Sequence, residues 1–240
     1  SPMRRGTRGE TRMDEVEAPD GIVDRAFADD GTEIVLHHRD GVWQIRVDGR
    51  ELMDSRHART ERALAHLACR SRPPSGAPSV LIGGLGMGFT LRAALDRLPA
   101  AAVVTVIEAF PAVTAWNRTC LGELAGSPLA DRRVTVADGD VRRWIEGASD
   151  AFDVVLLDVD NGPADLSLPG NGWLYGPEGA AHLRRALVPG GVLGVWSAAP
   201  APALAAALRA AGMAVRAHTL RAAPPDGRVR HTVVVGVRMD

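Results

Sequence analysis

Short apolar runs alternate with helix-like segments from residue 79 onward, and this alternation leaves few possible folds. Five runs have the length and residue types of buried strands, at 79–84, 102–108, 133–138, 152–158 and 191–197. The intervening segments, near 88–98, 111–124, 140–147 and 177–187, carry apolar residues at helical spacing. This order predicts a parallel sheet with helices on both faces. A helix pattern at 201–212 and strand patterns at 214–222 and 230–238 predict a late hairpin that closes one edge of the sheet.

The segment before residue 79 divides into three parts. Residues 1–28 are polar and charged, and we expect a mobile tail because they carry too little apolar surface to offset the entropy of ordering. Residues 29–54 contain strand patterns with Asp-Gly turns, which predict a small antiparallel β-meander. Residues 55–78 read as a helix followed by a Pro-rich linker. Residues 79–240 would then form the main domain.

The overall composition excludes several classes of protein. Hydrophobic residues make up 46% and charged residues 24%, and the net charge of -1 argues against a nucleic-acid binder. The two cysteines lack CxxC spacing, and no histidine pair has metal-ligand spacing, so we expect no metal. No apolar stretch reaches 18 residues and no signal-like segment begins the chain, so we expect a cytoplasmic protein without membrane contact.

Four glycines lie between the first strand and the first helix of the main domain, at Gly83, Gly84, Gly86 and Gly88. Glycines in this position allow a sharp turn and also let a ligand approach the backbone closely. A tight turn that serves only helix packing is the alternative. The sequence around the loop favours a ligand, because acidic residues end the following strands.

Acidic residues end three further strands, and these ends should meet at one edge of the sheet. Glu108, followed by Ala109, is placed to accept hydrogen bonds from ribose hydroxyls, although carboxylates also favour helix starts. Asp138 could receive the exocyclic amine of adenine or simply cap a helix. Asp158 and Asp160 follow the fourth strand. Such an acidic edge suits a cationic sulfonium nucleoside better than a pyrophosphate, which favours S-adenosylmethionine or its decarboxylated form.

The order of these motifs resembles the spermidine synthase-like family, whose fold is that of the class I methyltransferases. The glycine loop GGLGMG is similar to the family's GGGDGG, and ADRRVTVADGD (130–140) and FDVVLLDVDNGP (152–163) are similar to two later family motifs. The segment LYGPEGAAHLRRALVPGGVLGVW also matches. The resemblance implies a Rossmann-like, doubly wound, mostly parallel seven-stranded sheet preceded by a small N-terminal antiparallel β-meander.

The resemblance also implies roles for individual residues. The loop glycines would approach the nucleoside donor, Glu108 would hold the ribose, and Asp138 with Gly139 would meet the adenine. Asp158 would correspond to the active-site aspartate that deprotonates the attacking amine, since only a neutral amine can attack the carbon beside the sulfonium.

Parts of the acceptor site depart from the family pattern. The family's Asp-Ser-Ser-Asp-Pro becomes Asp-Val-Asp-Asn-Gly-Pro, which moves the second carboxylate to Asp160 and puts Asn161 where an amine-binding Asp is expected. Thr60 and Glu61 stand where the family carries a Tyr-Gln pair. Asp160, Glu61 and Asp165 are therefore candidate anchors for an amine. Tyr175, in a glycine-rich loop with Trp173, could enclose the acceptor or only pack against the protein.

The sequence therefore predicts an enzyme, a spermidine synthase-like transferase of polyamine biosynthesis that moves an aminopropyl group from decarboxylated S-adenosylmethionine to a small amine. A methyl or related alkyl transfer from S-adenosylmethionine is the first alternative, and a non-catalytic nucleoside-binding protein is the second. The meander and the sheet edge favour a homodimer.

Overall fold

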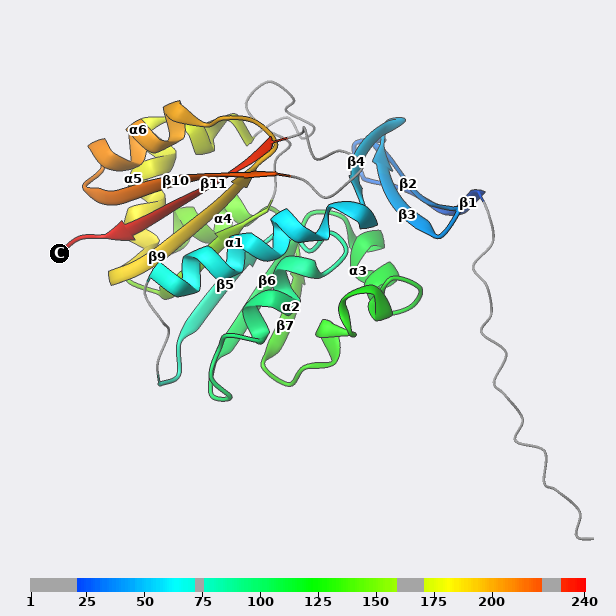
Figure 1. Ribbon diagram of the computed structural model, residues 1–240, viewed down its shortest axis with the longest axis horizontal. Helices are drawn as coiled ribbons and strands as arrows, with labels where there is room; N and C mark the ends of the chain where they lie inside the picture. The colour runs from blue at the N-terminus through cyan, green and yellow to red at the C-terminus, as the bar shows by residue number, and fades with distance from the viewer. Residues whose placement is uncertain (1–20, 72–75, 159–170, 222–229) are drawn as a thin grey trace, which may run out of the picture.

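A computed structural model describes residues 21–71, 76–158, 171–221 and 230–240 of the chain. In the described part, the strands form a seven-stranded sheet and a separate four-stranded sheet at the N-terminal side (Figure 1). This arrangement confirms the predicted α/β class with its N-terminal antiparallel addition.

The larger sheet has the strand order β10-β11-β9-β8-β5-β6-β7. Its strands are β5 (Ser79–Gly83), β6 (Val103–Glu108), β7 (Val134–Asp138), β8 (Phe152–Leu157), β9 (Leu187–Ser197), β10 (Met213–Arg221) and β11 (Arg230–Arg238). The strands β5 to β9 pair in parallel, while β11 runs antiparallel to both β9 and β10. The order reverses beside β5, and open sheets of this kind place their ligands at the strand carboxyl ends near that point.

Helices cover both faces of this sheet (Figure 1). They are α1 (Ala58–Ser71), α2 (Phe89–Leu95), α3 (Pro111–Asn117), α4 (Val141–Gly147), α5 (Pro177–Ala186) and α6 (Pro202–Ala210). One buried core joins α1, α2 and α3 to side chains such as Val80 and Ile82, and the other joins α4, α5 and α6 to side chains such as Leu81. The division follows from the two-residue alternation of a strand. The helix expected over 111–124 ends at Asn117 and is followed by a short 3-10 helix, η2 (Gly122–Ala125).

The N-terminal sheet is an antiparallel meander, as predicted, but it has four strands and begins at residue 21 instead of residue 29. They are β1 (Gly21–Phe27), β2 (Glu33–Arg39), β3 (Val42–Val47) and β4 (Arg50–Asp54). The expectation that residues 21–28 belong to a tail is therefore wrong, because β1 pairs with β2 along its length. Its sequence is too polar to read as a strand, and one of its contacts comes from far away: Trp116 Nε1 donates to Asp24 Oδ2 at 2.7 Å.

Helix α1 connects the two sheets and lies directly on the larger one. A 3-10 turn, η1 (Ser55–His57), leads from β4 into α1. Gly194 of β9 makes the close seat possible, since a Cβ there would lie 2.8 Å from Leu64 Cδ1 and 3.2 Å from Ala68 Cβ. The side chains of Leu64 and Ala68 are fully buried. A glycine in the middle of the sheet thus sets the height of the helix above it.

We expect Gly194→Ala to lower the free energy of unfolding by about 1–3 kcal/mol, because the added methyl group must push α1 away from the sheet. Gly147→Ala is the matched control: a Cβ there meets nothing within 4 Å. Urea unfolding of both variants measures the difference. Equal stability of the two variants would contradict this account of how α1 is seated.

Candidate active site at the carboxyl ends of the parallel strands

The carboxyl ends of β5, β6 and β8 are held together by the backbone of the glycine loop. The N–H of Gly84 donates to the carbonyl of Ile107 on β6, and the N–H of Asp158 donates to the carbonyl of Gly83, both at 2.9 Å. The residues predicted to form the site, on three separate strands, are therefore neighbours in space.

At three of the loop glycines, neighbouring side chains of the protein leave no room for a Cβ atom. A Cβ at Gly83 would come within 2.9 Å of Leu157 Cδ2 and of Val141 Cγ2. Gly86 has a φ of +51°, and a Cβ there would lie 2.7 Å from the sulfur of Met53, on β4. A Cβ at Gly88 would lie 3.0 Å from Pro128 Cγ. The packing alternative thus accounts for these three glycines, and contact of the loop with a nucleoside stays a prediction.

Glu108 fastens the loop to the end of β6. The residue is only 6% exposed. It accepts the N–H of Leu85 at 2.8 Å through Oε2 and the N–H of Phe110 at 2.9 Å through Oε1. Burial raises the pKa of Glu108, and the backbone N–H groups oppose that rise. Each carboxylate oxygen has a second lone pair, so ribose binding is compatible with this arrangement and stays a prediction. The next residue, Ala109, is exposed.

Asp138 and Gly139 end the neighbouring strand β7. Asp138 is exposed and its Oδ1 accepts from the Thr114 hydroxyl at 3.3 Å. It does not cap α4: that role belongs to Asp140, whose carboxylate accepts the N–H of Arg142 at 2.8 Å. A Cβ at Gly139 would meet nothing within 4 Å, so the backbone here is open to a ligand. The adenine roles of Asp138 and Gly139 stay predictions.

Asp158 follows β8 and is partly buried beside the loop. Its Oδ2 accepts the hydroxyl of Thr90, on α2, at 2.7 Å. Burial raises the pKa of Asp158 to about 6, the negative charge of Glu108 adds to the rise, and the Thr90 hydrogen bond opposes it. A carboxylate with this pKa can accept and release a proton near neutral pH, as a general base must.

Glu61 of α1 is brought to the same place and is 5% exposed. Burial and the charges of Asp158 and Asp54 hold the pKa of Glu61 well above the ordinary value of a glutamate, with a smaller opposing effect from Arg62. The charge of Asp158 acts on Glu61, and the charge of Glu108 acts on Asp158, so these three residues, on α1, directly after β8 and at the end of β6, are called the carboxylate group. A group of this kind attracts a cation.

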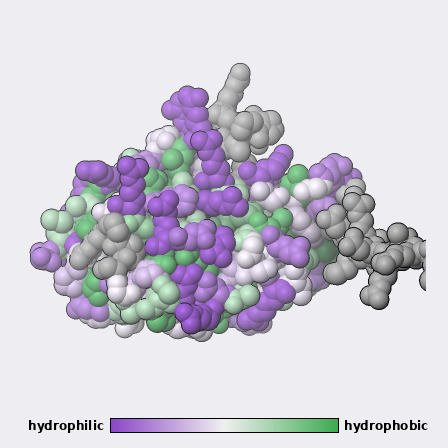
Figure 2. Space-filling view, turned by 60° about the horizontal axis from the view of Figure 1, so that its bottom comes forward, coloured by the Kyte–Doolittle hydropathy of each residue, from purple (hydrophilic) through white to green (hydrophobic). Residues whose placement is uncertain are grey.

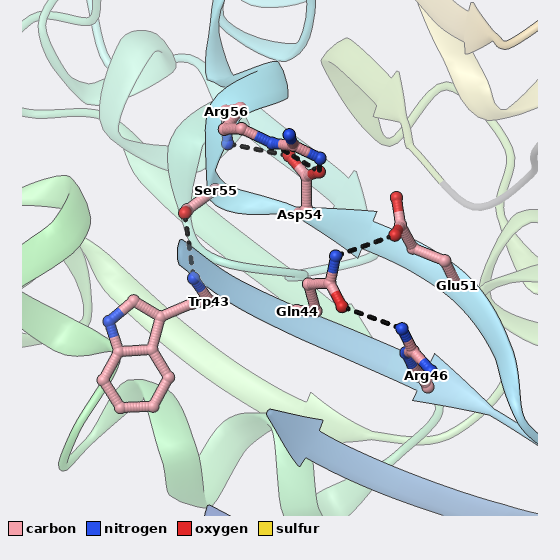
Figure 3. Close-up of polar contacts among 7 residues, drawn as sticks. All are labelled: Trp43, Gln44, Arg46, Glu51, Asp54, Ser55 and Arg56. Atoms are coloured by element: carbon pink, nitrogen blue, oxygen red, sulfur yellow. Dashed lines mark hydrogen bonds and ion pairs between the residues drawn. The ribbon is translucent and has the colours of Figure 1, made fainter. Parts of the chain in front are cut away.

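The sequence gives no sign of two residues that shape this group. Thr90 lies in an apolar helix, and its hydroxyl also approaches the carbonyl of Glu61 at 3.3 Å. Asp54 ends β4 and is fully buried, where it accepts the N–H of Arg56 at 2.8 Å and its guanidinium Nε at 2.9 Å (Figure 3). Neither residue belongs to a local sequence motif, so the sequence pattern does not indicate their part in the site.

Of the remaining predicted site residues, the structure describes only Tyr175. Asp160, Asn161 and Asp165 lie outside the described residues. Tyr175 and Trp173, in the short 3-10 helix η4 (Asn171–Tyr175), are partly buried and pack against the core of the α4–α6 face. Packing accounts for both aromatic residues, and the substrate contact of Tyr175 stays a prediction.

The described residues were also compared with the requirements of a metal site and of a membrane-spanning helix. Among them, no three or more His, Cys, Asp or Glu residues are grouped so that they could hold a metal ion. No helix in the described ranges is both long and apolar enough to cross a membrane. The face shown in Figure 2 mixes hydrophilic side chains with smaller apolar areas.

A hollow of about 600 Å³ lies away from the strand ends, on the N-terminal sheet. Its lining includes His37, Arg39, Arg46 and Arg56. Gln44, also in the lining, accepts from Arg46 and donates to Glu51 (Figure 3). Arg56, which is also in the lining, is bound to Asp54.

The strand order and the position of the site define an α/β protein of the class I methyltransferase type. A carbon methyltransferase, CurJ, aligns with a TM-score of 0.51 and 16% identity over 77% of this chain and 54% of that one. Spermidine synthase from Thermotoga maritima aligns with a TM-score of 0.73 and 17% identity, over 91% of this chain and 72% of that one. A spermidine synthase in complex with the transition-state analogue AdoDATO gives the same TM-score of 0.73 at 17% identity, with 91% and 72% covered.

The sequence relatives make the resemblance more specific. Polyamine aminopropyltransferase from Mycobacterium tuberculosis is 36% identical over 128 residues, which is 52% of this chain and 24% of the relative. Polyamine aminopropyltransferase 1 from Streptomyces coelicolor is 36% identical over 51% of this chain and 22% of the relative. These findings confirm the resemblance to the spermidine synthase-like family. The chain spans about a quarter of the length of these relatives, and no protein-family model matches it.

The raised pKa of Asp158 predicts how stability depends on pH. Between about pH 4 and pH 6 the unfolded chain ionises this carboxyl group more readily than the folded chain, so its contribution to folding declines as the pH rises. Asp158→Asn removes this decline and can still accept from Thr90. We expect the stability of the variant relative to the wild type to rise by about 1–3 kcal/mol from pH 4 to pH 8.

Urea unfolding of both proteins at several pH values measures this change. Asp29→Asn, at an exposed turn position, is the control and should give a constant difference from the wild type. A constant difference for Asp158→Asn as well would show that Asp158 ionises normally in the folded protein.

Proposed function

We propose that this chain transfers an aminopropyl group from decarboxylated S-adenosylmethionine to a small amine. The observation that carries the proposal is the position of Asp158, a partly buried carboxylate beside the glycine loop whose pKa is raised to about 6. The names of the sequence relatives support the same reaction and a role in polyamine biosynthesis. A cytoplasmic location is part of the proposal.

The charges near the loop fit a cationic donor. The carboxylates near the glycine loop are those of Glu61, Glu108 and Asp158. A bound sulfonium cation would compensate part of their negative charge. Arg92, the cation that could receive the carboxylate of intact S-adenosylmethionine, is bound instead to Asp96, with Nη2 2.7 Å from Oδ1. The carboxylates near the loop would also repel the carboxylate of intact S-adenosylmethionine, which supports the decarboxylated donor. Methyl transfer from intact S-adenosylmethionine is the second candidate. For Arg92 to bind the carboxylate of that donor, it would have to leave Asp96.

The residues of the site would divide the work as follows. Gly84, Gly86 and Gly88 would present the loop backbone to the donor, and Glu108 would accept the ribose hydroxyls. Asp138 and Gly139 would receive the adenine, since this end of β7 is open. When bound, the sulfonium nucleoside supplies an electrophilic carbon and a thioether leaving group.

Asp158 would act on the acceptor. An amine is protonated in solution, and its nitrogen can attack only after it has lost a proton. Asp158 would accept that proton, while Thr90 holds the carboxylate in place through Oδ2. The nitrogen then forms a bond to the carbon beside the sulfur, the carbon–sulfur bond breaks, and methylthioadenosine leaves. Placement of the two reactants in line supplies much of the rate enhancement.

The first test is calorimetric titration with S-adenosylmethionine, decarboxylated S-adenosylmethionine and methylthioadenosine. We expect the decarboxylated form to bind more tightly than the intact form, because the site offers carboxylates and Arg92 is engaged. Asp158→Asn should retain most of this binding, because Glu61 and Glu108 remain, and should lose at least 100-fold in transfer to an amine, which is the range for loss of a general base. Preference for the intact form would favour methyl transfer instead.

Two other outcomes separate the remaining possibilities. Binding without transfer to any amine would favour a non-catalytic nucleoside-binding protein. Failure to bind all three compounds would leave the glycines with a packing role alone. Asp29→Asn is again the control, and it should match the wild type in both measurements.

A homodimer is part of the proposal, and β1 supports it. Among the described strands, β1 lies at the outer edge of the N-terminal sheet, and its side chains Phe27 and Ile22 are 65% and 53% exposed. We expect the wild type to sediment as a dimer and the double variant Ile22→Asp/Phe27→Asp as a monomer. Trp144→Asp, on α4 at 43% exposure, is the control and should stay dimeric. A monomeric wild type would contradict the prediction.

A further inference from the structure

The hollow on the N-terminal sheet takes no part in the proposed reaction. Residues on one face of that sheet line it: His37 of β2 is the cross-strand partner of Gln44 of β3, and such partners point to the same side. Leu36 and Ile45 pair on the opposite face, and both are fully buried in the main core. The sheet therefore turns an apolar face to the core of the protein and a polar face to the hollow.

The lining of the hollow is rich in cationic side chains. Its described residues include three arginines and a histidine against one carboxylate: Arg39, Arg46, Arg56, His37 and Asp40. The whole chain has a net charge of -1, so this concentration of arginines is a local feature. A concave surface with several cationic groups attracts anions.

His37 lies between two of these arginines. Arg39 is two residues farther along β2, and Arg46 is two residues beyond the cross-strand partner of His37 on β3, in the opposite direction along the sheet. Positions two residues apart on a strand are roughly 7 Å apart and point to the same face. Burial lowers the pKa of His37, and the charges of Arg46, Arg25 and Arg39 lower it further. The positive charges of both strands are therefore felt at His37.

Arg46 and Arg39 keep N–H groups that no described residue accepts. Nη2 of Arg46 donates to Gln44 Oε1 at 3.1 Å, while its Nε is buried and meets no acceptor among the described residues (Figure 3). Arg39 is exposed and forms no hydrogen bond or ion pair within the described part of the chain. A buried donor without an acceptor is costly, and a ligand that supplies acceptor oxygens would remove that cost.

Other charged groups beside the hollow are already paired. Arg56 Nε donates to Asp54 at 2.9 Å, and Arg25 Nη1 lies 2.7 Å from a carboxylate oxygen of Glu33. Glu51 accepts the side-chain amide of the lining glutamine at 3.0 Å (Figure 3). The two guanidinium groups on either side of the histidine are therefore the ones best able to receive an anion.

We propose that this hollow binds a small molecule that carries a phosphate group, and that Arg39 and Arg46 hold the phosphate above His37. A guanidinium can bind two phosphate oxygens at once, which suits arginines with unused N–H groups. The volume of about 600 Å³ is that of a small-molecule site and is larger than a phosphate ion needs, so an organic part fits beside the phosphate. Val42 gives the lining an apolar side chain for that part. The site is separate from the carboxylate group and goes beyond the proposed function.

The first test is calorimetric titration of the protein with ribose 5-phosphate, inorganic phosphate and ribose at low ionic strength. Ribose 5-phosphate should bind, inorganic phosphate should bind more weakly, and ribose should not bind. Arg39→Gln and Arg46→Gln should each weaken the binding of ribose 5-phosphate at least about tenfold, because each loses a hydrogen bond between charged groups. Arg216→Gln, at an exposed position of β10 outside the lining, is the control and should behave as the wild type.

A second measurement locates the ligand within the hollow. A bound phosphate stabilises the protonated imidazole, so the pKa of His37, followed by NMR, should rise when ribose 5-phosphate is added. His37→Gln identifies the resonance of this side chain. Arg39→Lys keeps the charge but loses the two-oxygen contact, and its affinity should lie between those of the wild type and Arg39→Gln. This order separates loss of recognition from damage to the sheet.

Several outcomes would overturn the proposal. They are the absence of ribose 5-phosphate binding, equal affinity in the wild type and both glutamine variants, and an unchanged pKa of His37 at saturation. Tighter binding of a short single-stranded RNA than of ribose 5-phosphate, lost in the same variants, would assign this surface to nucleic acid instead. Because these titrations need no sulfonium nucleoside, their failure would leave the proposed transfer reaction untouched.

Discussion

The hydrogen bonds of the Glu108 carboxylate hold the strand ends of this protein in register. One oxygen binds the N–H of Leu85 in the glycine loop, and the other binds the N–H of Phe110 at the start of the next connection. These bonds tie the turn after β5 to the end of β6, next to the point between β5 and β8 where the strand order reverses. A loop with several positive φ angles would otherwise have many conformations, because glycine restricts the backbone so little. The carboxylate removes that freedom, and the rest of the site is built on the fixed loop.

Helix α1 is the second element on which the site depends. It follows directly from the N-terminal sheet and lies on β9 where Gly194 has no side chain. That seat brings Glu61 to Asp158, although the two residues are almost a hundred positions apart. The N-terminal sheet also contacts the loop itself, through Met53 against Gly86. The small sheet is therefore part of the wall of the site as well as an addition to the fold.

Apart from the two hydrogen bonds of Glu108, the negative charges of the carboxylates at this edge do not serve stability. Burial raises the pKa of Glu61, Glu108 and Asp158, so each is less readily ionised in the folded chain than in the unfolded one. Groups with perturbed pKa values are concentrated at functional sites, where a charge is retained for a ligand rather than for packing. Asp54 differs, because Arg56 compensates it. The uncompensated carboxylates are the ones that lie nearest the glycine loop.

The sequence determined the main sheet, the alternation of its helices and the set of acidic strand ends, because buried parallel strands and amphipathic helices leave strong periodic patterns. It also determined that Glu108, Asp138 and Asp158 share one edge, since the carboxyl ends of parallel strands do so. Tertiary structure alone decided that β1 is a strand, because its polar sequence is held by β2 and by Trp116. Tertiary structure likewise decided that Asp140 rather than Asp138 caps α4, that Met53 and Pro128 occupy the space beside the glycines, and that Thr90 links Glu61 to Asp158. These outcomes depend on contacts between distant segments, and no local pattern of residues records such contacts.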